Sequence, residues 1–406
     1  EVFEEGGFDC ILGNPPWEQL QILEKEFFAS RSPEIANAKN DDVRKKLIQN
    51  LPETNPVLAE EWQQIKYLSD AQNKFVNESG RYPLTAIGKI DTYVVLTETS
   101  WKLVNSKGSV GVIVPSGIAT DKYNQFFLQA LVDHNALYSF YDFTNRGYIF
   151  RSLESTKSFS LLTISNANKN ILKLASRLWN IKELASTNKH YTLTGEDIKR
   201  INPNTKNLPF FDHKFNAKII QKIYRNIPVL EREESKINPW NSLLKQGLFN
   251  MSSNSDLFIT LNELNQKTEP EKFITLYESK YINIFNHRSA TFYGIPEERK
   301  YGTRAPTNLA NKSQLANPEW LILPRYWVHK KEVEDRIPDF WKYQWLMGFR
   351  NAISAVADSR SARLAVIPKT GVGNSMPLIF SDQPIKKLCA LAANFNALIF
   401  DYVVKQ

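Results

Sequence analysis

The sequence predicts an α/β domain at the N-terminus, followed by a second domain of α+β type. Three observations lead to this prediction. An apolar run at residues 10–12 is stopped by two prolines, as at the end of a short strand. A helical pattern at 91–104 turns at Gly108 into the β-branched run 110–114, which makes half of a doubly wound unit. From about residue 166 basic residues increase and periodicity weakens, so we place the domains at 1–165 and 166–406.

The composition is that of an ordinary globular protein with two to three domains. Its 406 residues are 42% hydrophobic and 23% charged, and no apolar run approaches the ~18 residues of a membrane-spanning helix. The N-terminus is acidic and shows no secretory signal. Two cysteines, Cys10 and Cys389, suit a reducing cytoplasm. The five histidines never pair with cysteines at ligand spacing, so we expect a cytoplasmic protein without a metal site or membrane contact.

Charge is distributed unevenly between the two expected domains. Residues 1–165 hold 16 basic and 21 acidic residues, a net charge of −5. Residues 166–406 hold 35 basic and 22 acidic residues, a net charge of +13. A basic excess of this size favours a polyanion, and we expect nucleic acid as the partner of the C-terminal part. A solvated basic surface without a partner is the alternative.

The most informative stretch is FDCILGNPPW, at residues 8–17. The apolar run 10–12, flanked by Gly6, Gly7 and Gly13, reads as a brief buried strand, and Asn14-Pro15-Pro16-Trp17 follows at once. Each proline fixes its own φ and pushes the preceding residue toward extended geometry. The Asn14 side chain and the first carbonyls should therefore be held rigidly at the carboxyl edge of a sheet, where open α/β folds bind ligands.

Such a turn suits the recognition of a planar amino group. The Asn14 amide oxygen and the Pro15 carbonyl are two acceptors at a fixed separation, and an exocyclic amino group offers two N–H donors. Holding both hydrogens directs the nitrogen lone pair at an electrophile, while Trp17 can stack on the ring that carries the amino group. The alternative is a turn that only ends a strand, with Trp17 as a core aromatic.

The same stretch resembles motif IV of the S-adenosylmethionine-dependent amino-group methyltransferases, in their DNA adenine-N6 branch. The wider context is similar to prokaryotic type IIG restriction–modification enzymes and to the PglX-like enzymes of the BREX and DISARM phage-defence systems. The resemblance implies a Rossmann-like domain, double-stranded DNA as partner, and catalytic roles for Asn14, Pro15, Pro16 and Trp17. It also implies that the main S-adenosylmethionine motif lies upstream of residue 1. We therefore expect no cofactor-binding residues in this chain and no methyl transfer by the chain alone.

A permuted order, with the cofactor turn after motif IV, has one candidate. Residues 369–374 (KTGVGN) follow the apolar run 364–367, but they lack a third glycine and a following helix signal. We expect a surface loop at this place.

Residues 18–80 read as a charged helical insertion. Apolar residues recur at helical spacing in 19–30, two aspartates can cap a helix at 41–50, and 56–76 is amphipathic. In the resembled family, insertions after motif IV shape the DNA cleft. Plain helical packing is the alternative.

Two further strands are expected at 137–143 and 158–164, and together they suggest a closing hairpin. In the resembled enzymes such a hairpin ends the sheet, and an aromatic between its strands stacks on the second face of the extruded base. Phe150 matches that aromatic best and Tyr148 second. A core aromatic at a strand end is the alternative for both.

The second domain resembles the target-recognition region of the PglX-like enzymes. The resemblance rests on residues 277–280 with 286–288, on 323–328, and on 348–350 with 359–363. Arginine is the best side chain for guanine edges and phosphates, and an intradomain ion pair is the alternative for each arginine. The DNA-contact candidates are Lys280, His287, Arg288, Arg350, Arg360 and Arg363. Glu278 and Lys280 also match the end of a metal-dependent nuclease motif, but this pattern is frequent by chance and we expect no nuclease here.

Together these features predict a site-specific DNA adenine-N6 methyltransferase that flips its target base out of the duplex. Two alternatives belong to other classes. RNA bases and protein glutamine amides present the same planar amino group. The chain can also be a DNA-specificity module without catalysis.

Overall fold

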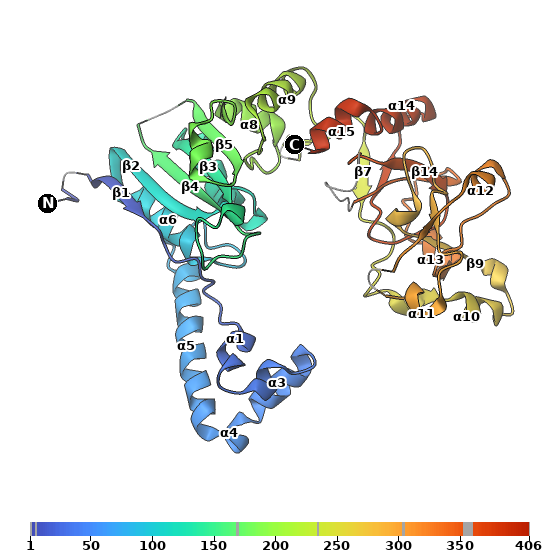
Figure 1. Ribbon diagram of the computed structural model, residues 1–406, viewed down its shortest axis with the longest axis horizontal. Coiled ribbons are helices and arrows are strands. Elements are labelled where there is room, and N and C mark those ends of the chain that lie inside the picture. Colours follow the sequence, from blue (N-terminus) through green and yellow to red (C-terminus); the bar gives the residue numbers. More distant parts are fainter. Residues whose placement is uncertain are drawn as a thin grey trace. The chain divides into compact units, whose positions relative to one another are not determined.

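The computed structural model describes residues 2–4, 6–167, 170–233, 235–302, 305–351 and 360–405 (Figure 1). The chain divides into two compact units, Glu1–Val229 and Leu230–Gln406, which we call unit 1 and unit 2. Both units combine helices with β-sheet, which confirms the predicted mixed α/β fold class.

Unit 1 is built on a six-stranded sheet in the order β1-β2-β4-β3-β5-β6. The strands are β1 (Phe8–Gly13), β2 (Val104–Pro115), β3 (Leu137–Thr144), β4 (Ser158–Ser165), β5 (Leu172–Leu178) and β6 (His190–Leu193). β1 runs parallel to β2 and β3 runs parallel to β5, whereas β4 is antiparallel to both of its neighbours. β3 and β4 therefore form the predicted hairpin, but it does not close the sheet, because β5 and β6 lie beyond β3.

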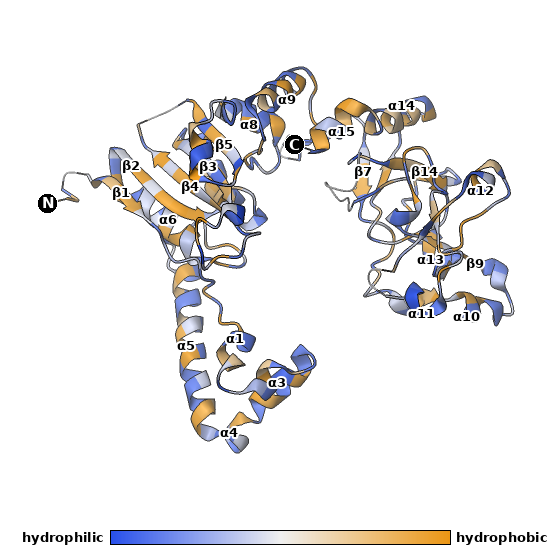
Figure 2. Ribbon diagram, in the orientation of Figure 1, coloured by the Kyte–Doolittle hydropathy of each residue, from blue (hydrophilic) through white to orange (hydrophobic). Residues whose placement is uncertain are grey.

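Alternating side chains explain the central strands. In β2 the side chains of Val110, Val112 and Val114 are buried, and the residues between them are more exposed. Figure 2 shows the central strands largely in the orange of apolar residues. Four longer helices accompany the sheet: α6 (Thr92–Leu103), α7 (Gln125–Asp133), α8 (Gly195–Ile201) and α9 (Lys214–Asn226).

β1 is an edge strand, and the prediction of a buried strand is wrong. Phe8 is 38% exposed and Leu12 is 84% exposed, because β1 pairs only with β2 within the described residues. The register between β1 and β2 shifts after Phe8. A Cβ on Gly108 would lie 2.6 Å from the Phe8 carbonyl oxygen, so this close approach of the two strands requires glycine.

The predicted helical insertion lies between β1 and α6. It comprises α1 (Glu24–Ala29), α2 (Pro33–Ala36), α3 (Asp41–Gln49), α4 (Leu51–Thr54) and α5 (Pro56–Glu78). α5 projects away from the sheet, and the short helices gather near its far end (Figure 1). Phe27, Phe28 and Trp62 form the aromatic centre there, with ring centroids 4.8–5.2 Å apart. The cap of α3 is Asn40, whose side chain accepts the Val43 N–H, rather than the aspartates that follow it.

The domain boundary predicted at residue 165 is wrong. β5 and β6 extend the sheet of unit 1 beyond β3, and α8 and α9 contact β6. The change near residue 166 is a change in charge and not in fold. Residues 166–229 hold 12 basic and 4 acidic residues, a net of +8, so unit 1 carries +3 and unit 2 carries +5. The basic excess is therefore densest in the last part of unit 1.

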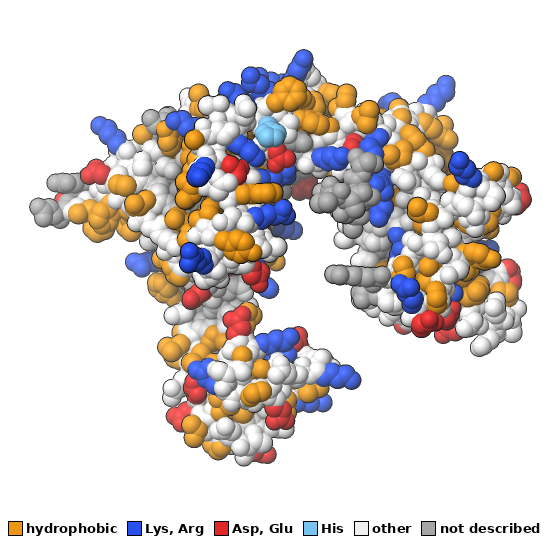
Figure 3. All heavy atoms as spheres, viewed as in Figure 1, with side chains coloured by type: hydrophobic (Ala, Val, Ile, Leu, Met, Phe, Trp, Pro, Cys, Tyr) orange, Lys and Arg blue, Asp and Glu red, His pale blue; other side chains and the backbone are white. Residues whose placement is uncertain are grey.

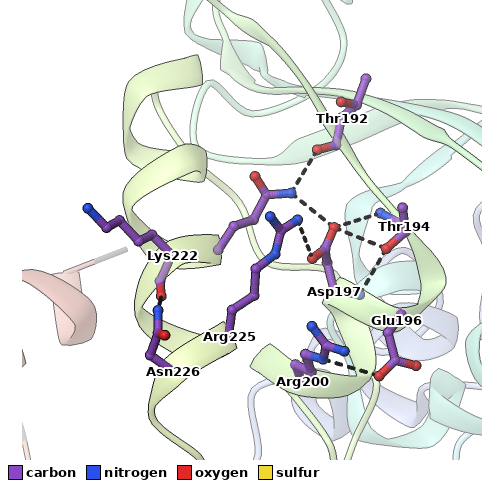
Figure 4. A network of polar contacts seen from close by, with 9 residues as sticks. Thr192, Thr194, Glu196, Asp197, Arg200, Lys222, Arg225 and Asn226 are labelled. Carbon is purple, nitrogen blue, oxygen red and sulfur yellow. Dashed lines mark hydrogen bonds and ion pairs between the residues drawn. The ribbon is translucent and has the colours of Figure 1, made fainter.

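A polar network joins this last part of unit 1 together (Figure 4). Asp197 in α8 accepts from the N–H and Oγ1 of Thr194, at 3.2 and 3.0 Å, and Thr194 Oγ1 accepts the Asp197 N–H in return. From α9, Arg225 and Gln221 donate to the same carboxylate at 3.1 and 3.0 Å. Gln221 also donates to the Thr192 carbonyl in β6. One nearly buried carboxylate thus links β6, α8 and α9.

We predict that Asp197→Ala lowers the free energy of unfolding by about 1–3 kcal/mol, because it removes the acidic half of the capping box of α8 and charge-assisted hydrogen bonds. Burial alone would raise the pKa of Asp197, but the bonds from Thr194 and Arg225 hold it below its ordinary value. A lowered folded pKa stabilises the protein above the unfolded pKa, near ~3.9, and this contribution is lost as pH falls through the folded pKa. The difference between wild type and variant should thus be full at pH 7 and small at pH 3, as measured by urea denaturation.

Glu196→Ala is the matched control for this prediction. Glu196 is the adjacent carboxylate, is exposed, and pairs with Arg200 at 3.2 Å. Its removal should change the unfolding free energy by about 0.5 kcal/mol or less. Equal effects of the two substitutions would show that the Asp197 network does not stabilise unit 1.

Unit 2 contains two four-stranded sheets, β15-β9-β12-β8 and β14-β13-β16-β7, and the pair β10-β11. The strands are β7 (Ser242–Lys245), β8 (Phe258–Ile259), β9 (Phe273–Tyr277), β10 (Ala290–Thr291), β11 (Asn308–Leu309), β12 (Trp327–His329), β13 (Trp345–Phe349), β14 (Leu364–Pro368), β15 (Gly371–Val372) and β16 (Leu378–Ser381). The helices are α10 (Leu261–Asn265), α11 (Glu297–Lys300), α12 (Lys312–Ala316), α13 (Lys330–Glu334), α14 (Ile385–Phe395) and α15 (Leu398–Lys405). Tyr281, Phe292 and Phe380 are fully buried in its core.

The stretch KTGVGN is not a surface loop, contrary to the prediction. Gly371 and Val372 form β15, which runs parallel to β9, and both residues are buried together with Thr370. A Cβ on Gly371 would lie 2.5 Å from a methyl group of Val328, so glycine allows the strands to pack closely here.

No single helix of the described residues combines the length and apolar character needed to cross a bilayer. α14 and α15 meet that test only when taken together, and they are bent by 55° where they join.

Candidate active site

The NPPW motif (Asn14–Trp17) leaves β1 at its carboxyl end, on the same edge of the sheet as the end of the parallel strand β2. The Asn14 side chain is exposed and makes no hydrogen bond with any residue that the structure describes. Its amide oxygen is therefore available to an incoming donor. The exposed Asn14 agrees with the predicted open edge.

Trp17 is half-buried and fixed in orientation. Its indole N–H donates to the Ile113 carbonyl of β2 at 3.2 Å. The ring lies 6.4 Å from Phe159, nearly parallel to it at 26°. Phe159 in turn stacks on Phe143 at 5.3 Å. Trp17 is thus the outer member of an aromatic cluster. Its inner face packs on that cluster, as expected for a core aromatic.

Phe150 is brought beside Trp17 from a distant part of the chain. The two ring centroids are 6.0 Å apart at 77°. The loop that carries Phe150 is held by the buried side chain of Asn145, which donates to the Phe150 and Leu153 carbonyls at 2.9 and 2.7 Å and accepts the Phe150 N–H at 3.1 Å. The structure therefore joins Phe150 and Trp17 in one cluster. Asn145 itself was not predicted, and the only sequence signal was an asparagine at a strand end before a glycine.

Tyr148 lies elsewhere. It is 63% exposed, has a left-handed backbone with φ +50°, and shares no ring contact with Trp17 in the described residues. Of the two stacking candidates, only Phe150 is placed next to the NPPW motif.

The space between Trp17 and Phe150 is too small for a base in this conformation. A base stacked on both sides needs parallel rings about 7 Å apart, twice the contact distance of carbon atoms. The two rings are instead nearly perpendicular, and Phe150 also contacts Phe159 at 4.8 Å. Entry of a base between them requires Phe150 to move.

Thr92, at the start of α6, forms hydrogen bonds to Pro16 in the NPPW motif and to Glu18, which follows the motif. Its hydroxyl donates to the Pro16 carbonyl at 2.6 Å and accepts the Glu18 N–H at 3.2 Å. Its backbone N–H donates to the Glu18 carbonyl at 2.9 Å. Thr92 directly follows Asp91, which forms a strand-like bridge with Gln19. It thus fixes the carbonyl of the second proline of the motif.

For the methyl transfer that the sequence predicts at Asn14, we expect Thr92→Val to lower the rate about 3- to 10-fold, which is the effect of one lost hydrogen bond. The KM for the substrate should change little, because Thr92 positions the motif and contacts no substrate itself. Thr92→Ser keeps the hydroxyl and should restore the rate. Steady-state kinetics of the full-length protein measure both parameters. Equal rates for the valine variant and wild type would remove Thr92 from the site.

In unit 2, most of the candidate DNA-contact residues have partners inside the unit. Arg288 donates to the carbonyls of Asn317 and Trp320 at 2.8 and 2.7 Å. Arg360 pairs with Asp401 at 3.3 Å, and Arg363 donates to the Arg360 carbonyl at 3.2 Å. These are the intradomain contacts named above as the alternative.

The other three candidates lie in different surroundings. Arg350 is half-buried, and its Nε has no hydrogen-bond partner among the described residues. His287 bonds to the Tyr277 hydroxyl at 3.1 Å, and burial with the nearby Arg288 charge lowers the pKa of His287. Burial lowers the pKa of Lys280, which lies 3.3 Å from Glu278. DNA contact stays a prediction for all six residues.

Glu278 is the centre of a buried ion-pair network. Arg325 grips its carboxylate with two bonds of 2.7 and 2.9 Å, and the Tyr281 hydroxyl donates to it at 3.3 Å. Because both oxygens are already occupied, Glu278 serves the packing of unit 2. Within the described residues no group of three or more His, Cys, Asp or Glu side chains is placed to hold a metal ion.

A basic stripe on α9 was missed by the sequence reasoning. Lys214, Lys218 and Lys222 recur every four residues, are exposed, and make no ion pair within the described residues. Figure 3 shows Lys and Arg side chains at the surface over α8 and α9. The spacing K-x-x-x-K-x-x-x-K at helical period was a readable signal for such a stripe.

Comparison with known proteins gives remote structural similarities. No protein-family model matches the chain, and no curated protein matches it. Among solved structures, the type IIL restriction–modification enzyme MmeI in complex with DNA is 10% identical, with a TM-score of 0.39 over 94% of this chain. The type IIG restriction endonuclease BpuSI is 12% identical, with a TM-score of 0.30 over 79%. A type I methyltransferase subunit from Streptococcus thermophilus is 12% identical, with a TM-score of 0.27 over 34%. The chain spans 34–42% of the length of these proteins.

Proposed function

We propose that the chain is the motif IV and target-recognition part of a site-specific DNA methyltransferase that acts on N6 of adenine in a restriction–modification or phage-defence enzyme. One observation carries the proposal. The Asn14 amide is exposed at the carboxyl edge of the sheet and has no hydrogen-bond partner among the described residues, and the nearby Trp17 indole is fixed by its own hydrogen bond.

The residues of the chain would act mainly by orientation. The Asn14 oxygen and the Pro15 carbonyl accept the two hydrogens of the adenine amino group, so that its lone pair faces the methyl donor. Trp17 stacks on one face of the base. Phe150 moves away from Trp17 to admit the base and then covers its other face. The flip costs about a few kcal/mol, which stacking and the two hydrogen bonds offset.

We base no step on a cofactor site within this chain. Within the described residues, the only glycine-rich candidate is residues 369–374, and these form the buried β15 instead of a strand–turn–helix. In the resembled enzymes S-adenosylmethionine supplies the methyl group. The role proposed for this chain is therefore to bind and orient the amino group.

DNA affinity is proposed to come from basic groups in both units. In unit 1 the α9 stripe of Lys214, Lys218 and Lys222 is free to contact phosphates. In unit 2 we favour Arg350, which is half-buried and pairs with no acidic side chain among the described residues, whereas Arg360 pairs with Asp401. Lysines suit phosphate contacts, and arginine also suits base edges, so we assign affinity to the first group and sequence reading to the second.

The test is methyl transfer by the full-length protein that carries these residues. It is incubated with methyl-labelled S-adenosylmethionine and with duplex DNA, structured RNA or a protein extract, and the products are hydrolysed. We expect label in N6-methyladenine from DNA. Label in RNA bases or glutamine side chains would replace the proposed substrate by the corresponding alternative. DNA binding without transfer to any substrate would indicate a specificity module.

A further inference from the structure

Unit 1 contains a pocket of about 800 Å³ that the NPPW motif does not use. It lies at the carboxyl ends of β2, β3 and β5, and none of the residues Asn14–Trp17 lines it. Its volume falls within the ~300–1,000 Å³ of small-molecule sites. The lining combines hydroxyl groups, three basic and three acidic side chains and two aromatic rings.

This pocket and the Trp17 cluster lie on opposite faces of the sheet. Phe143 and Phe159 are register partners, and both belong to the cluster around Trp17. Asp142 and Thr144, the neighbours of Phe143 along β3, line the pocket. Because side chains alternate along a strand, the two sets point to opposite faces. The pocket is therefore a separate site.

The floor of the pocket is fixed by a buried carboxylate. Asp142 is 3% exposed and accepts from the Ser116 hydroxyl at 2.5 Å and from the Arg177 N–H at 3.0 Å. Arg177 has a left-handed backbone with φ +55°, which is rare for a residue with a side chain. Asp142 thus holds a strained backbone position near the end of β5 in place, and burial raises the pKa of this carboxyl. Strain held by buried contacts is typical of functional sites.

One wall of the pocket carries an indole and an arginine that forms no ion pair within the described residues. Trp179 is 49% exposed, and the Arg146 guanidinium lies 5.2 Å from its ring centroid. Arg146 pairs with no acidic side chain among the described residues, whereas Arg177 is held by Asp212 through two bonds of 3.1 Å. A Cβ on Gly147 would lie 1.9 Å from the Trp179 carbonyl oxygen, so glycine lets the Arg146 turn pack directly on the Trp179 strand end.

We propose that this pocket binds a nucleotide, with the base stacked on Trp179 and the phosphate bound by Arg146. Indole rings stack on any base, and a guanidinium binds phosphate in a bidentate manner. Arg146 leaves the indole when the base arrives, because its side chain is exposed and is held only by the ring. The nucleotide is either a free mononucleotide or one residue of a DNA strand. The proposal does not depend on methyl transfer, since the two sites share no residue.

Calorimetric titration of the full-length protein with three probes tests this site. The probes are deoxyadenosine monophosphate, deoxyadenosine and a short single-stranded oligonucleotide. Wild type should bind the monophosphate saturably. Trp179→Ala should weaken both the monophosphate and the nucleoside about tenfold or more, which is the effect of one lost stack. Arg146→Ala should weaken binding of the monophosphate about tenfold, because the phosphate contact is lost. It should not weaken binding of the nucleoside, because the base then stacks on an indole that no guanidinium covers.

Arg200→Ala is the matched control, since this exposed arginine of α8 does not line the pocket. It should leave all three affinities unchanged. Tighter binding of the oligonucleotide than of the monophosphate, with both variants weakened, would identify a DNA strand as the source. Preference for the monophosphate would identify a free nucleotide. Absence of saturable binding by wild type, or equal binding by both pocket variants and wild type, would overturn the proposal.

Discussion

Asn14→Ala should lower methyl transfer by the full-length protein at least about 100-fold, while its affinity for duplex DNA stays within about twofold. Loss of the amide oxygen removes one of the two acceptors that orient the amino group, and misplacement of a reacting group by ~1 Å already has an effect of this size. Affinity should survive because phosphate contacts dominate it, and Asn14 is a neutral side chain. Single-turnover transfer and salt-matched binding measurements separate the two quantities.

Asn188→Ala provides the control for this prediction. Asn188 is also exposed, and its side chain makes no hydrogen bond with the described residues. Its replacement should change neither transfer nor binding. Wild-type transfer by the Asn14 variant would exclude the amino-group site. Parallel loss of transfer and DNA binding would instead assign Asn14 to the stability of the sheet edge.

The site could be predicted from sequence where local chemistry determines it. Two prolines end the short apolar strand and so place Asn14 at its carboxyl end. The Asn14 side chain is exposed in the structure. The pairing of Phe150 with Trp17 came from a resemblance and not from spacing. The anchors Asn145 and Thr92 could not be predicted, because each acts through hydrogen bonds to backbone carbonyls that only the folded chain brings near.

In the fold, too, features set by the local sequence were predicted, and features set by tertiary contacts were not. Strands β3 and β4 lie where alternation placed them, since their periodicity is set by the faces that they bury. The predicted run 110–114 lies inside β2, but β2 already begins at Val104, so the turn predicted at Gly108 is wrong. The burial of β1 was mispredicted because an apolar run does not reveal whether a strand has one neighbour or two. The boundary near residue 165 was misplaced because surface charge changes there, while the hydrogen bonds of the sheet continue through β5 and β6.

The burial of Glu278 leads to the largest expected effect on stability. Glu278→Ala should lower the free energy of unfolding of unit 2 by about 3–5 kcal/mol, because Arg325 loses its partner while it stays buried. Arg325 is 8% exposed and Lys280 lies 3.3 Å from the same carboxylate, so two cations would face each other without an acid between them. Replacing both Glu278 and Arg325 by methionine should recover much of the loss, since neither charge is then left unpaired.

Hydrogen exchange of the β9 and β12 amides in the full chain reports this loss locally. Glu297→Ala is the control, because this exposed carboxylate of α11 pairs with Lys300 at 2.6 Å and should contribute at most about 1 kcal/mol. Burial lowers the pKa of Lys280 and the Glu278 charge opposes that shift, so removal of Glu278 lowers this pKa further. The unfolded state then binds more protons, and the variant should gain stability as pH rises. Two results would show that the Glu278 network does not hold unit 2 together. One is a Glu278 variant whose free energy of unfolding is less than about 1 kcal/mol below that of wild type. The other is a difference from wild type that is larger at pH 9 than at pH 7.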